Sequence, residues 1–369
     1  MGEQLSRLSE SGGCGGGYDP SMRALTTIPR TAGSLAVTEV PDPRPGTGEL
    51  LVDGIAVGVC GTDKEIAGGD YGWAPPGHDR LVIGHESLGR VRTAPDGSGF
   101  SPGDLVVGVV RRPDPVPCGA CAHDEFDMCR NGRYTERGIK QLDGYASDQW
   151  AVEADYAVRL DDRLADVGML MEPTTVVAKA WEQVERVGAR AWFEPQRVLV
   201  TGSGPIGLLA ALLGVQRGLE VHVLDRVTSG PKPRLVHELG ASYHHSDIDA
   251  VMKRVKPDVV IEATGVPQLV LGAMAGMVPY GITVLTGVSS GGRKVRIDPG
   301  LLNREIVLEN DVVVGSVNAN LRHYAQAAKA LAAADLGWLG QLVSRRVPLA
   351  DFAEAFEAGE HDVKVVITL

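Results

Sequence analysis

Three groups of residues have types and spacings that could perform chemistry, and the first suggests a metal site. It contains Cys60 in Cys-Gly-Thr-Asp, and His85 with Glu86 in Gly-His-Glu-Ser-Leu-Gly. Thiolate, imidazole and carboxylate are the ligands that zinc takes, and a catalytic zinc site uses three ligands and keeps a further position open. A single cysteine is more often part of a core, and a single histidine is often a hydrogen-bonded polar group. The spacing alone therefore leaves open whether Cys60 and His85 meet in space.

The second group holds three of the five cysteines within twelve positions, at Cys118, Cys121 and Cys129. Five thiols in 369 residues do not make a disulfide framework, so this clustering is typical of a metal site. A structural zinc needs four ligands. The sequence offers three candidates for the fourth: Asp114, His123 and Asp124. Without a fourth ligand the cysteines are expected to be reduced and free of metal.

The third group is a glycine-rich loop in which Gly202, Gly204 and Gly207 form a GxGxxG pattern. Gly202 permits a tight turn, Gly204 lets the backbone approach a pyrophosphate, and Gly207 lets the following helix pack closely on the strand. The helix N-terminus attracts the anion. Asp225 follows 18 residues beyond Gly207, where a carboxylate accepts hydrogen bonds from an adenosine ribose. The alternative interpretation is a plain strand-to-helix turn.

The elements that must position these groups change in character near Ala165. From Arg23 to about Val158, short apolar runs alternate with turns rich in proline and glycine, which predicts a β-barrel-like domain. From Arg197 onwards strands alternate with helices, which predicts a parallel sheet. The expected strands are 198–200, 221–224, 259–261 and 282–285.

Two helices are expected in this second region, and a last strand follows them. The first carries Ile206, Leu209, Ala210 and Leu213 on one face and ends at Gly218. The second follows Asn318. The C-terminal run 363–369 is β-like again.

Composition excludes several classes of protein. A chain of 369 residues is too long for one small core and fits two domains. Hydrophobic residues make up 44% and charged residues 22%, as in soluble globular proteins. The net charge of −11 argues against a nucleic-acid partner, and the lack of an 18-residue apolar run argues against a membrane-spanning helix. Residues 1–21 have no apolar signal core and are expected to form a flexible tail, and the cytoplasm is the expected compartment.

Together these motifs resemble the zinc-dependent medium-chain alcohol dehydrogenases. The segments that carry the resemblance run along nearly the whole chain from Met22: Cys60-Gly-Thr-Asp, Gly84-His-Glu-x-x-Gly89, Gly103-Asp-x-Val106 and Gly202-x-Gly-x-x-Gly207. Within that family the sequence is most similar to the glucose 1-dehydrogenase branch. Four segments carry the narrower resemblance: 134–139, 171–179, 302–308 and 315–318.

The resemblance implies an α/β protein of two domains. A GroES-like β-rich catalytic domain is expected over residues 22–175. A doubly wound Rossmann domain with a parallel sheet, which binds NAD(P), is expected over residues 176–318. Residues 319–369 are expected to return to the catalytic domain.

The resemblance also assigns Cys60, His85 and Glu172 as ligands of a catalytic zinc. Glu172 stands where many alcohol dehydrogenases have a third cysteine and where the glucose branch has a carboxylate. Glu86 is expected beside the zinc, as a supporting or exchanging ligand that reaches the substrate. Thr62 matches the hydroxyl that contacts the substrate oxygen and passes its proton outward.

Further matches concern the sugar and the cysteine cluster. Glu136 and Asn318 match positions that contact the sugar in the glucose branch, and their alternative roles are a solvated loop charge and a polar strand-end residue. Two positions depart from the family: Glu65 replaces a histidine of the usual proton relay, and Val176 replaces a frequent acidic residue. An altered sugar or polyol preference is therefore an open alternative. The family's first lobe cysteine falls here on Pro115, which cannot ligate a metal through its side chain.

For the cofactor, the resemblance adds four expected contacts to the glycines and to Asn318: Pro205, Ile206, Val288 and Val317. Asp225 accepts ribose hydroxyls and repels a 2′-phosphate, which favours NAD. Arg226 could pair with that phosphate, so NADP is expected to remain usable. Lys232 and Arg234 are expected on the same following loop.

The function that follows is a zinc-dependent oxidoreductase that transfers a hydride from the alcohol carbon of a sugar or polyol to NAD(P). The expected enzyme is a homo-oligomer, either a dimer or a tetramer, with no nucleic-acid or membrane partner. One alternative is the same chemistry on another secondary alcohol or a biosynthetic intermediate. A second alternative is a non-catalytic Rossmann binding protein, against which the set of Cys60, His85 and Glu172 argues.

Overall fold

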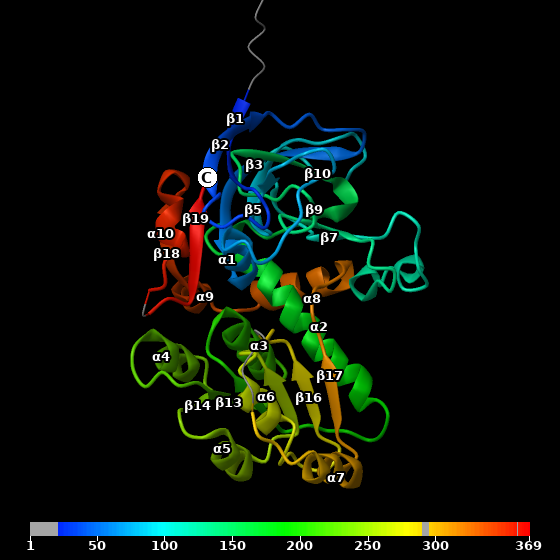
Figure 1. Ribbon diagram of the computed structural model, residues 1–369, viewed down its shortest axis with the longest axis vertical. Helices are drawn as coiled ribbons and strands as arrows, with labels where there is room; N and C mark the ends of the chain where they lie inside the picture. The colour runs from blue at the N-terminus through cyan, green and yellow to red at the C-terminus, as the bar shows by residue number, and fades with distance from the viewer. Residues whose placement is uncertain (1–20, 290–294, 360) are drawn as a thin grey trace, which may run out of the picture.

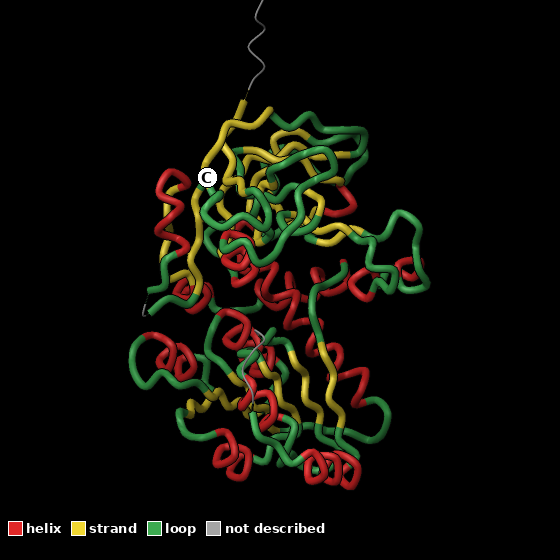
Figure 2. Tube along the Cα trace, in the orientation of Figure 1, coloured by secondary structure: helices red, strands yellow, loops and turns green. Residues whose placement is uncertain are grey.

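The computed structural model describes residues 21–289, 295–359 and 361–369 and arranges them in two parts, one rich in strands and one of alternating strands and helices (Figures 1 and 2). Of the expected N-terminal tail, residues 1–21, all but the last residue lie outside the described residues, and that last residue, Ser21, begins the first strand. No helix in the described part is long and apolar enough to cross a membrane.

The strand-rich part is built around one long strand, β3. Its strands are β1 (Ser21–Thr27), β2 (Ala36–Pro41), β3 (Glu49–Val59), β4 (Leu81–Val82), β5 (Glu86–Thr93), β6 (Leu105–Gly108), β7 (Arg111–Arg112), β8 (Thr135–Arg137), β9 (Gln141–Leu142), β10 (Gln149–Glu153) and β11 (Ala157–Arg159). Strand β3 pairs with β10, β5 and the C-terminal β19, all antiparallel. Two register shifts between β3 and β5 bend this sheet, as bulges do in barrels. Helix α1 (Gly61–Ala67) follows β3 directly.

The second part is a six-stranded parallel sheet in the order β14-β13-β12-β15-β16-β17. Its strands are β12 (Arg197–Thr201), β13 (Glu220–Leu224), β14 (Ser242–His244), β15 (Val259–Glu262), β16 (Ile282–Leu285) and β17 (Val312–Gly315). Counted along the chain this is the order 3-2-1-4-5-6 of a Rossmann domain, which confirms the expected fold. The helices between the strands are α3 (Pro205–Gln216), α4 (Pro231–Glu238), α5 (Ile248–Val255), α6 (Pro267–Ala273) and α7 (Pro299–Glu309).

Helix α3 differs from the expected helix with one apolar face. Its residues from Gly207 to Gly214 are all buried, so apolar side chains surround the whole helix. The reason is its position: α3 packs on strands β12 and β13 and also on helix α2 (Met171–Gly188). A helix covered on several sides needs no polar face.

The chain returns to the strand-rich part after residue 318. Helices α8 (Leu321–Ala332), α9 (Leu336–Leu342) and α10 (Phe352–Phe356) accompany strands β18 (Val343–Pro348) and β19 (Lys364–Thr368), and β19 lies between β18 and β3. Helix α2 runs through the expected boundary at residues 175 and 176 and extends from one part into the other (Figure 1). We propose the domain limits 22–175, 176–318 and 319–369, with α2 as the shared connection.

The close approach of Gly207 to Gly202 predicts that Gly207 cannot be replaced without loss of stability, whereas Gly204 can. A Cβ at Gly207 would lie 1.8 Å from the carbonyl oxygen of Gly202, whereas a Cβ at Gly204 would meet no atom within 4 Å. Gly207→Ala should lower the free energy of unfolding by about 3 kcal/mol because the backbone must shift. The matched variant Gly204→Ala should change it by less than about 1 kcal/mol. Thermal and urea unfolding measure both, and equal stability of the two variants would contradict this account.

Candidate active site

Cys60 is positioned by the start of helix α1. It is the N-cap residue, and its Sγ accepts a hydrogen bond from the backbone N–H of Thr62 at 3.3 Å. The carboxylate of Asp63 accepts the backbone N–H of Cys60 at 2.9 Å, which completes a capping box. The sequence Cys-Gly-Thr-Asp thus holds the sulfur at the N-terminus of helix α1.

His85 meets Cys60 across the strand-rich part. Its Nε2 lies 3.0 Å from the Sγ of Cys60; His85 is buried and Cys60 is half-buried. Gly84 turns the chain into position with a φ of +88°, and a Cβ there would lie 2.8 Å from the Val57 side chain. Asp63 places Oδ1 3.4 Å from the Nδ1 of His85, so a carboxylate stands behind the imidazole, as it commonly does behind metal-binding histidines.

Glu86 completes a group of possible metal ligands and has a partner that the sequence analysis missed. One donor atom each from Cys60, His85 and Glu86 lie within 4.8 Å of one another. Both oxygens of Glu86 also accept hydrogen bonds from the Nζ of Lys364, at 2.6 and 2.7 Å. Both side chains of this pair are 2% exposed. A single lysine within the apolar C-terminal strand was the available signal.

Glu172 begins helix α2 close to this group but outside it. Its carboxylate makes no hydrogen bond or ion pair with any residue that the structure describes. Burial raises the pKa of Glu172 to about 7, although His85 acts in the opposite direction. A carboxylate that is withdrawn from water without a partner is costly unless a cation joins it. Its role as the third zinc ligand stays a prediction.

The donor set fits a zinc ion. Burial raises the pKa of the Cys60 thiol. Burial lowers the pKa of His85, but Cys60 and Asp63 outweigh this effect and raise it well above the ordinary value. Asp63 and Glu86 are also buried, and Lys364 is the cation bonded to Glu86. A divalent cation held by sulfur, nitrogen and oxygen would take the place of the protons on Cys60 and His85 and would give the Glu172 carboxylate a partner.

Glu136 and Asn318, the two expected sugar contacts, lie together. The Nδ2 of Asn318 donates to the Oε1 of Glu136 at 2.6 Å. The same oxygen accepts two hydrogen bonds from Arg111, at 2.9 and 3.1 Å, and sequence reasoning had not singled out this arginine. No described residue bonds the second oxygen of Glu136, Oε2. The bond between Glu136 and Asn318 therefore joins strand β8 to the segment that leaves the Rossmann sheet.

The glycine-rich loop has the geometry expected of a dinucleotide site. Gly202 has a φ of +92°, and Gly204 is the N-cap of α3 with open space before it. Pro205 is the first residue of α3, and Ile206 follows it. This leaves the helix N-terminus open to a phosphate.

Asp225 is held against this loop by Ser203, which the sequence analysis missed. Its Oδ2 accepts both the backbone N–H and the hydroxyl of Ser203 at 2.7 Å. Its Oδ1 accepts the backbone N–H of Arg226 at 2.6 Å. Burial raises the pKa of Asp225, but these hydrogen bonds outweigh it and leave the pKa below the ordinary value. The carboxylate is therefore a fixed negative charge beside the expected ribose position.

The basic residues after Asp225 differ in whether their side chains are free to contact a cofactor phosphate. Arg226 is exposed and its side chain has no partner among the described residues. Lys232 and Arg234 lie on helix α4, not on a loop as expected. Arg234 contacts Gln341 at 3.1 Å and Glu238 at 3.4 Å, so it is engaged away from the loop. Val288 and Val317 are 77% and 61% exposed, so both remain open to a ligand.

Cys118, Cys121 and Cys129 form a compact group, with their sulfur atoms within 4.8 Å of one another. They lie in the cysteine lobe, residues 113–134, which extends beyond β7 (Figure 1). Hydrogen bonds from the Arg130 and Cys121 backbone lower the pKa of Cys118 to about 6. No fourth cysteine, histidine or carboxylate among the described residues joins the group.

Each residue expected as a fourth ligand for a zinc in the cysteine lobe either has other contacts or is exposed. The carboxylate of Asp114 bonds Val116, Asn131 and Arg133. The ring of His123 contacts the carbonyl of Gly119 at 2.7 Å, and Asp124 is exposed. A second zinc stays a prediction.

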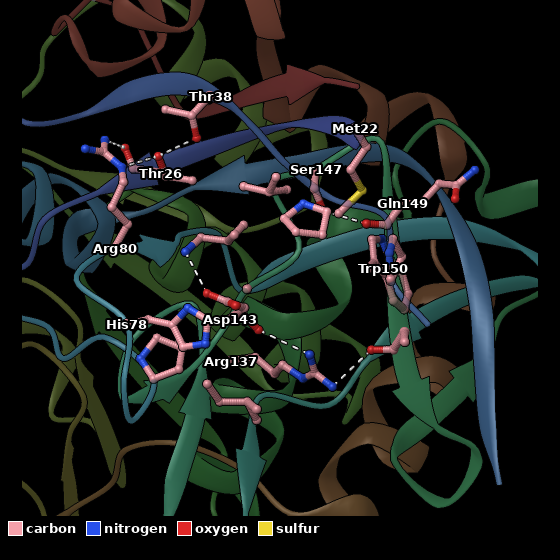
Figure 3. Close-up of a pocket in the computed structure, with 18 of the residues that line it drawn as sticks. Met22, Thr26, Thr38, His78, Arg80, Arg137, Asp143, Ser147, Gln149 and Trp150 are labelled. Carbon is pink, nitrogen blue, oxygen red and sulfur yellow. Dashed lines mark hydrogen bonds between the residues drawn. The ribbon is translucent and has the colours of Figure 1, made fainter. Parts of the chain in front are cut away.

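A groove of about 660 Å³ lies elsewhere in the strand-rich part (Figure 3). Strands β1 and β2 border it, together with residues around His78, Arg137 and Trp150. None of the expected metal ligands and no Rossmann residue lines it. It is therefore not the site described above.

Comparisons with known proteins agree with this geometry. Residues 46–162 match the family model "Alcohol dehydrogenase GroES-like domain", and residues 165–369 match "Glucose dehydrogenase C-terminus". Glucose 1-dehydrogenase of Thermoproteus tenax is 41% identical over 94% of this chain and 99% of its own. The counterpart from Methanocella arvoryzae is 37% identical over the same shares.

A solved structure shows the same architecture. The glucose dehydrogenase of Haloferax mediterranei, in complex with NADP, zinc and gluconolactone, superimposes with a TM-score of 0.87. It is 33% identical, over 94% of this chain and 99% of that one. The fold and the donor set thus define a medium-chain dehydrogenase with a GroES-like domain. The chain belongs to the glucose dehydrogenase family of these enzymes.

The geometry predicts that His85 is required for the metal but not for the cofactor. His85→Ala should lose the catalytic zinc and reduce turnover by at least about a thousandfold, since removal of a ligand opens the site. The dissociation constant of the reduced cofactor should stay within about twofold, because the glycine-rich loop lies on the other domain. Zinc analysis, initial rates at 340 nm and calorimetry measure these effects.

The exposed His78 provides the control for this experiment, since His78→Ala should behave as wild type. Near-normal turnover in His85→Ala would reject the assignment. The same zinc analysis tests the cysteine lobe. A second zinc that survives in His85→Ala would place it there, whereas a single zinc lost with His85 would leave the lobe free of metal.

Proposed function

We propose that this protein is a zinc-dependent dehydrogenase that oxidises the anomeric carbon of an aldose to a lactone and reduces NAD(P). One observation carries the proposal: the group of Cys60, His85 and buried carboxylates occurs in the same chain as a complete dinucleotide loop. The relatives named glucose 1-dehydrogenase, and the one solved with NADP, zinc and gluconolactone, support the substrate class.

The proposed zinc ligands are Cys60, His85 and Glu172. When bound, zinc acts as a Lewis acid that stabilises the alkoxide of the substrate. Glu86 stays beside this set, held by Lys364. Thiol ligands must remain reduced, and the described cysteines are all free. This supports the reducing cytoplasm as the compartment.

The chain's own residues guide the proton and the sugar. In the proposed reaction the Thr62 hydroxyl accepts the proton of the substrate hydroxyl and passes it outward to solvent. The nearby Glu65 is exposed and offers a carboxylate where the family has a relay histidine. The free Oε2 of Glu136 accepts a hydrogen bond from a sugar hydroxyl. Asn318 holds Glu136 in position through Oε1.

We further propose that the hydride passes from the sugar carbon to the nicotinamide of NAD, with NADP as a slower alternative. Asp225 is ionised and fixed beside the ribose, so it disfavours a 2′-phosphate. Arg226 is exposed without a partner and offers compensating charge. The relative solved with NADP supports use of the phosphorylated cofactor.

We propose a homo-oligomer, either a dimer or a tetramer. Strand β17 is an edge strand of the parallel sheet, and helix α7 beside it exposes three large apolar side chains: Leu301, Val307 and Leu308. An edge strand next to exposed apolar surface is suited to pairing with a second copy. A single-chain molar mass by light scattering would contradict this assembly.

The substrate class is tested by initial rates with aldoses, polyols and simple alcohols, each with NAD and NADP. We expect the highest kcat/KM with an aldose, and a lactone as the product. Val176 lies one helical turn after Glu172 and cannot bond a hydroxyl, so sugars other than glucose should be accepted within about tenfold. Activity confined to simple alcohols would overturn the proposal, and cofactor binding without any turnover would favour the non-catalytic alternative.

Cofactor preference is tested by changing one charge at a time. Asp225→Asn should raise the ratio of kcat/KM for NADP to kcat/KM for NAD by about tenfold. The substitution removes the repulsion between the carboxylate and the 2′-phosphate and keeps the size of the side chain. Arg226→Ala should move it downward by a similar factor. Arg234→Ala is the matched control, since that side chain contacts Gln341 and Glu238. A wild-type enzyme with clearly higher kcat/KM for NADP would contradict the preference for NAD.

A further inference from the structure

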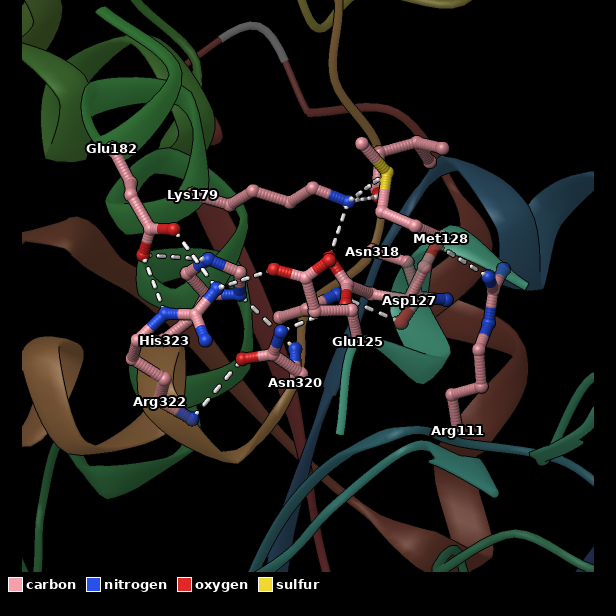
Figure 4. A network of polar contacts seen from close by, with 12 residues as sticks. Arg111, Glu125, Asp127, Met128, Lys179, Glu182, Asn318, Asn320, Arg322 and His323 are labelled. Atoms are coloured by element: carbon pink, nitrogen blue, oxygen red, sulfur yellow. Dashed lines mark hydrogen bonds and ion pairs between the residues drawn. The ribbon is translucent and has the colours of Figure 1, made fainter. Parts of the chain in front are cut away.

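A buried ion pair connects the cysteine lobe to helix α2 (Figure 4). The Oδ2 of Asp127 lies 2.7 Å from the Nζ of Lys179, and both side chains are 2% exposed. The Oδ1 of Asp127 accepts a hydrogen bond from Asn320 at 2.8 Å. Its backbone carbonyl accepts one from Arg111 at 2.9 Å. Asp127 is therefore the centre of a network drawn from three distant segments of the chain.

Each partner of Asp127 is connected to residues 317 and 318, the segment expected to contact cofactor and sugar: directly, through Glu136, or as the residue that follows closely in the chain. Lys179 donates to the backbone carbonyl of Val317 at 2.9 Å. Arg111 holds Glu136, which in turn bonds Asn318. Asn320 caps helix α8 directly after this segment. The lobe thus reaches the proposed active site through two routes that meet at residues 317 and 318.

The segment at residues 317 and 318 depends on these contacts for its shape. Strand β17 ends at Gly315, so the sheet no longer supports the backbone beyond it. Asn318 has a φ of +63°, in the left-handed region, which asparagine adopts more readily than most residues other than glycine. Outside the sheet, this conformation still needs contacts that hold it in one place. Here Lys179 fixes the carbonyl before Asn318, and Glu136 fixes its side chain.

Stability alone does not explain a buried pair of this kind. Removing two charges from water is expensive, and apolar residues of similar volume are often at least as stable in such places. We infer that Asp127 is a positioning residue that acts through Lys179 to set Val317 and Asn318 for the nicotinamide and the sugar. The inference rests on the proposed function, because that function makes this segment part of the binding site.

Three variants of the full-length protein test the inference. Asp127→Asn keeps the shape but removes the negative charge. Lys179→Met removes the donor to Val317. The double variant removes both charges and leaves no unpaired buried charge, so it carries the test if either single variant fails to fold. Calorimetry gives the dissociation constant of NADH or NADPH, and initial rates give KM and kcat for the sugar.

We expect each single variant to raise the dissociation constant of the cofactor by about tenfold, the effect of one misplaced hydrogen bond. Each should also raise the KM for the sugar. The double variant should recover thermal stability but keep the weak binding and high KM, because the donor to Val317 is still missing. The double variant should also be no worse than either single variant, since both act through one contact.

The matched control is Glu182→Gln on the same helix. Glu182 pairs with Arg322 at 2.9 Å and with His323 at 3.1 Å and has no contact with Val317 or Asn318. This variant should lose stability while binding and KM stay within about twofold. The inference would be overturned if Glu182→Gln raised the cofactor dissociation constant and the sugar KM as much as Asp127→Asn does. A double variant in which cofactor binding recovers together with stability would also overturn it.

Failure of the proposed function remains distinguishable from failure of this inference. Wild-type protein that binds NADH or NADPH but oxidises no aldose would reject the proposed function. The dissociation constants of the three variants would still decide the role of Asp127, because they need neither sugar nor turnover.

Discussion

Buried negative charge around His85 is the constraint on which the site depends. Asp63, Glu86 and Glu172 gather there with the Cys60 sulfur, and Lys364 is the cation bonded to Glu86. Charges withdrawn from water are tolerated only where other charges compensate them. Lys364 balances Glu86, and the raised pKa of His85 lets its imidazolium balance Asp63, but the carboxylate of Glu172 has no partner among the described residues. A bound divalent cation would pair with Glu172 and would supply a Lewis acid that promotes oxidation of an alcohol.

The groups of this site come from separate segments of the chain, and most lie at the end of a strand or in a turn. Strand β3 delivers Cys60 to the cap of α1, the turn at Gly84 delivers His85, and β19 inserts beside β3 to deliver Lys364. The Rossmann sheet presents its dinucleotide loop at the start of α3. Helix α2 joins the two parts and carries both Glu172 and Lys179. One helix thus carries both the proposed third zinc ligand and the lysine that donates to Val317.

The sequence predicted the fold class, because glycine turns and the alternation of strands with helices are local signals, whereas the zinc ligands stay a prediction. The structure confirms the parallel Rossmann sheet and brings Cys60 and His85 together, which the spacing alone had left open. Lys364, Arg111 and Ser203 escaped prediction, since their partners lie far away in sequence or depend on a backbone conformation. Helix α3 was predicted, but the burial of all its residues from Gly207 to Gly214 was not, because periodicity does not reveal that helix α2 also packs against it.

X-ray absorption at the zinc edge tests the central claim most directly, in protein whose lobe cysteines Cys118, Cys121 and Cys129 are replaced by serine. The account predicts one zinc per chain whose neighbours are a single sulfur, one imidazole nitrogen and oxygens. The sulfur should then disappear when Cys60 is also replaced by serine. A protein that holds no zinc and still oxidises its substrate, or a zinc without a sulfur neighbour, would contradict the account.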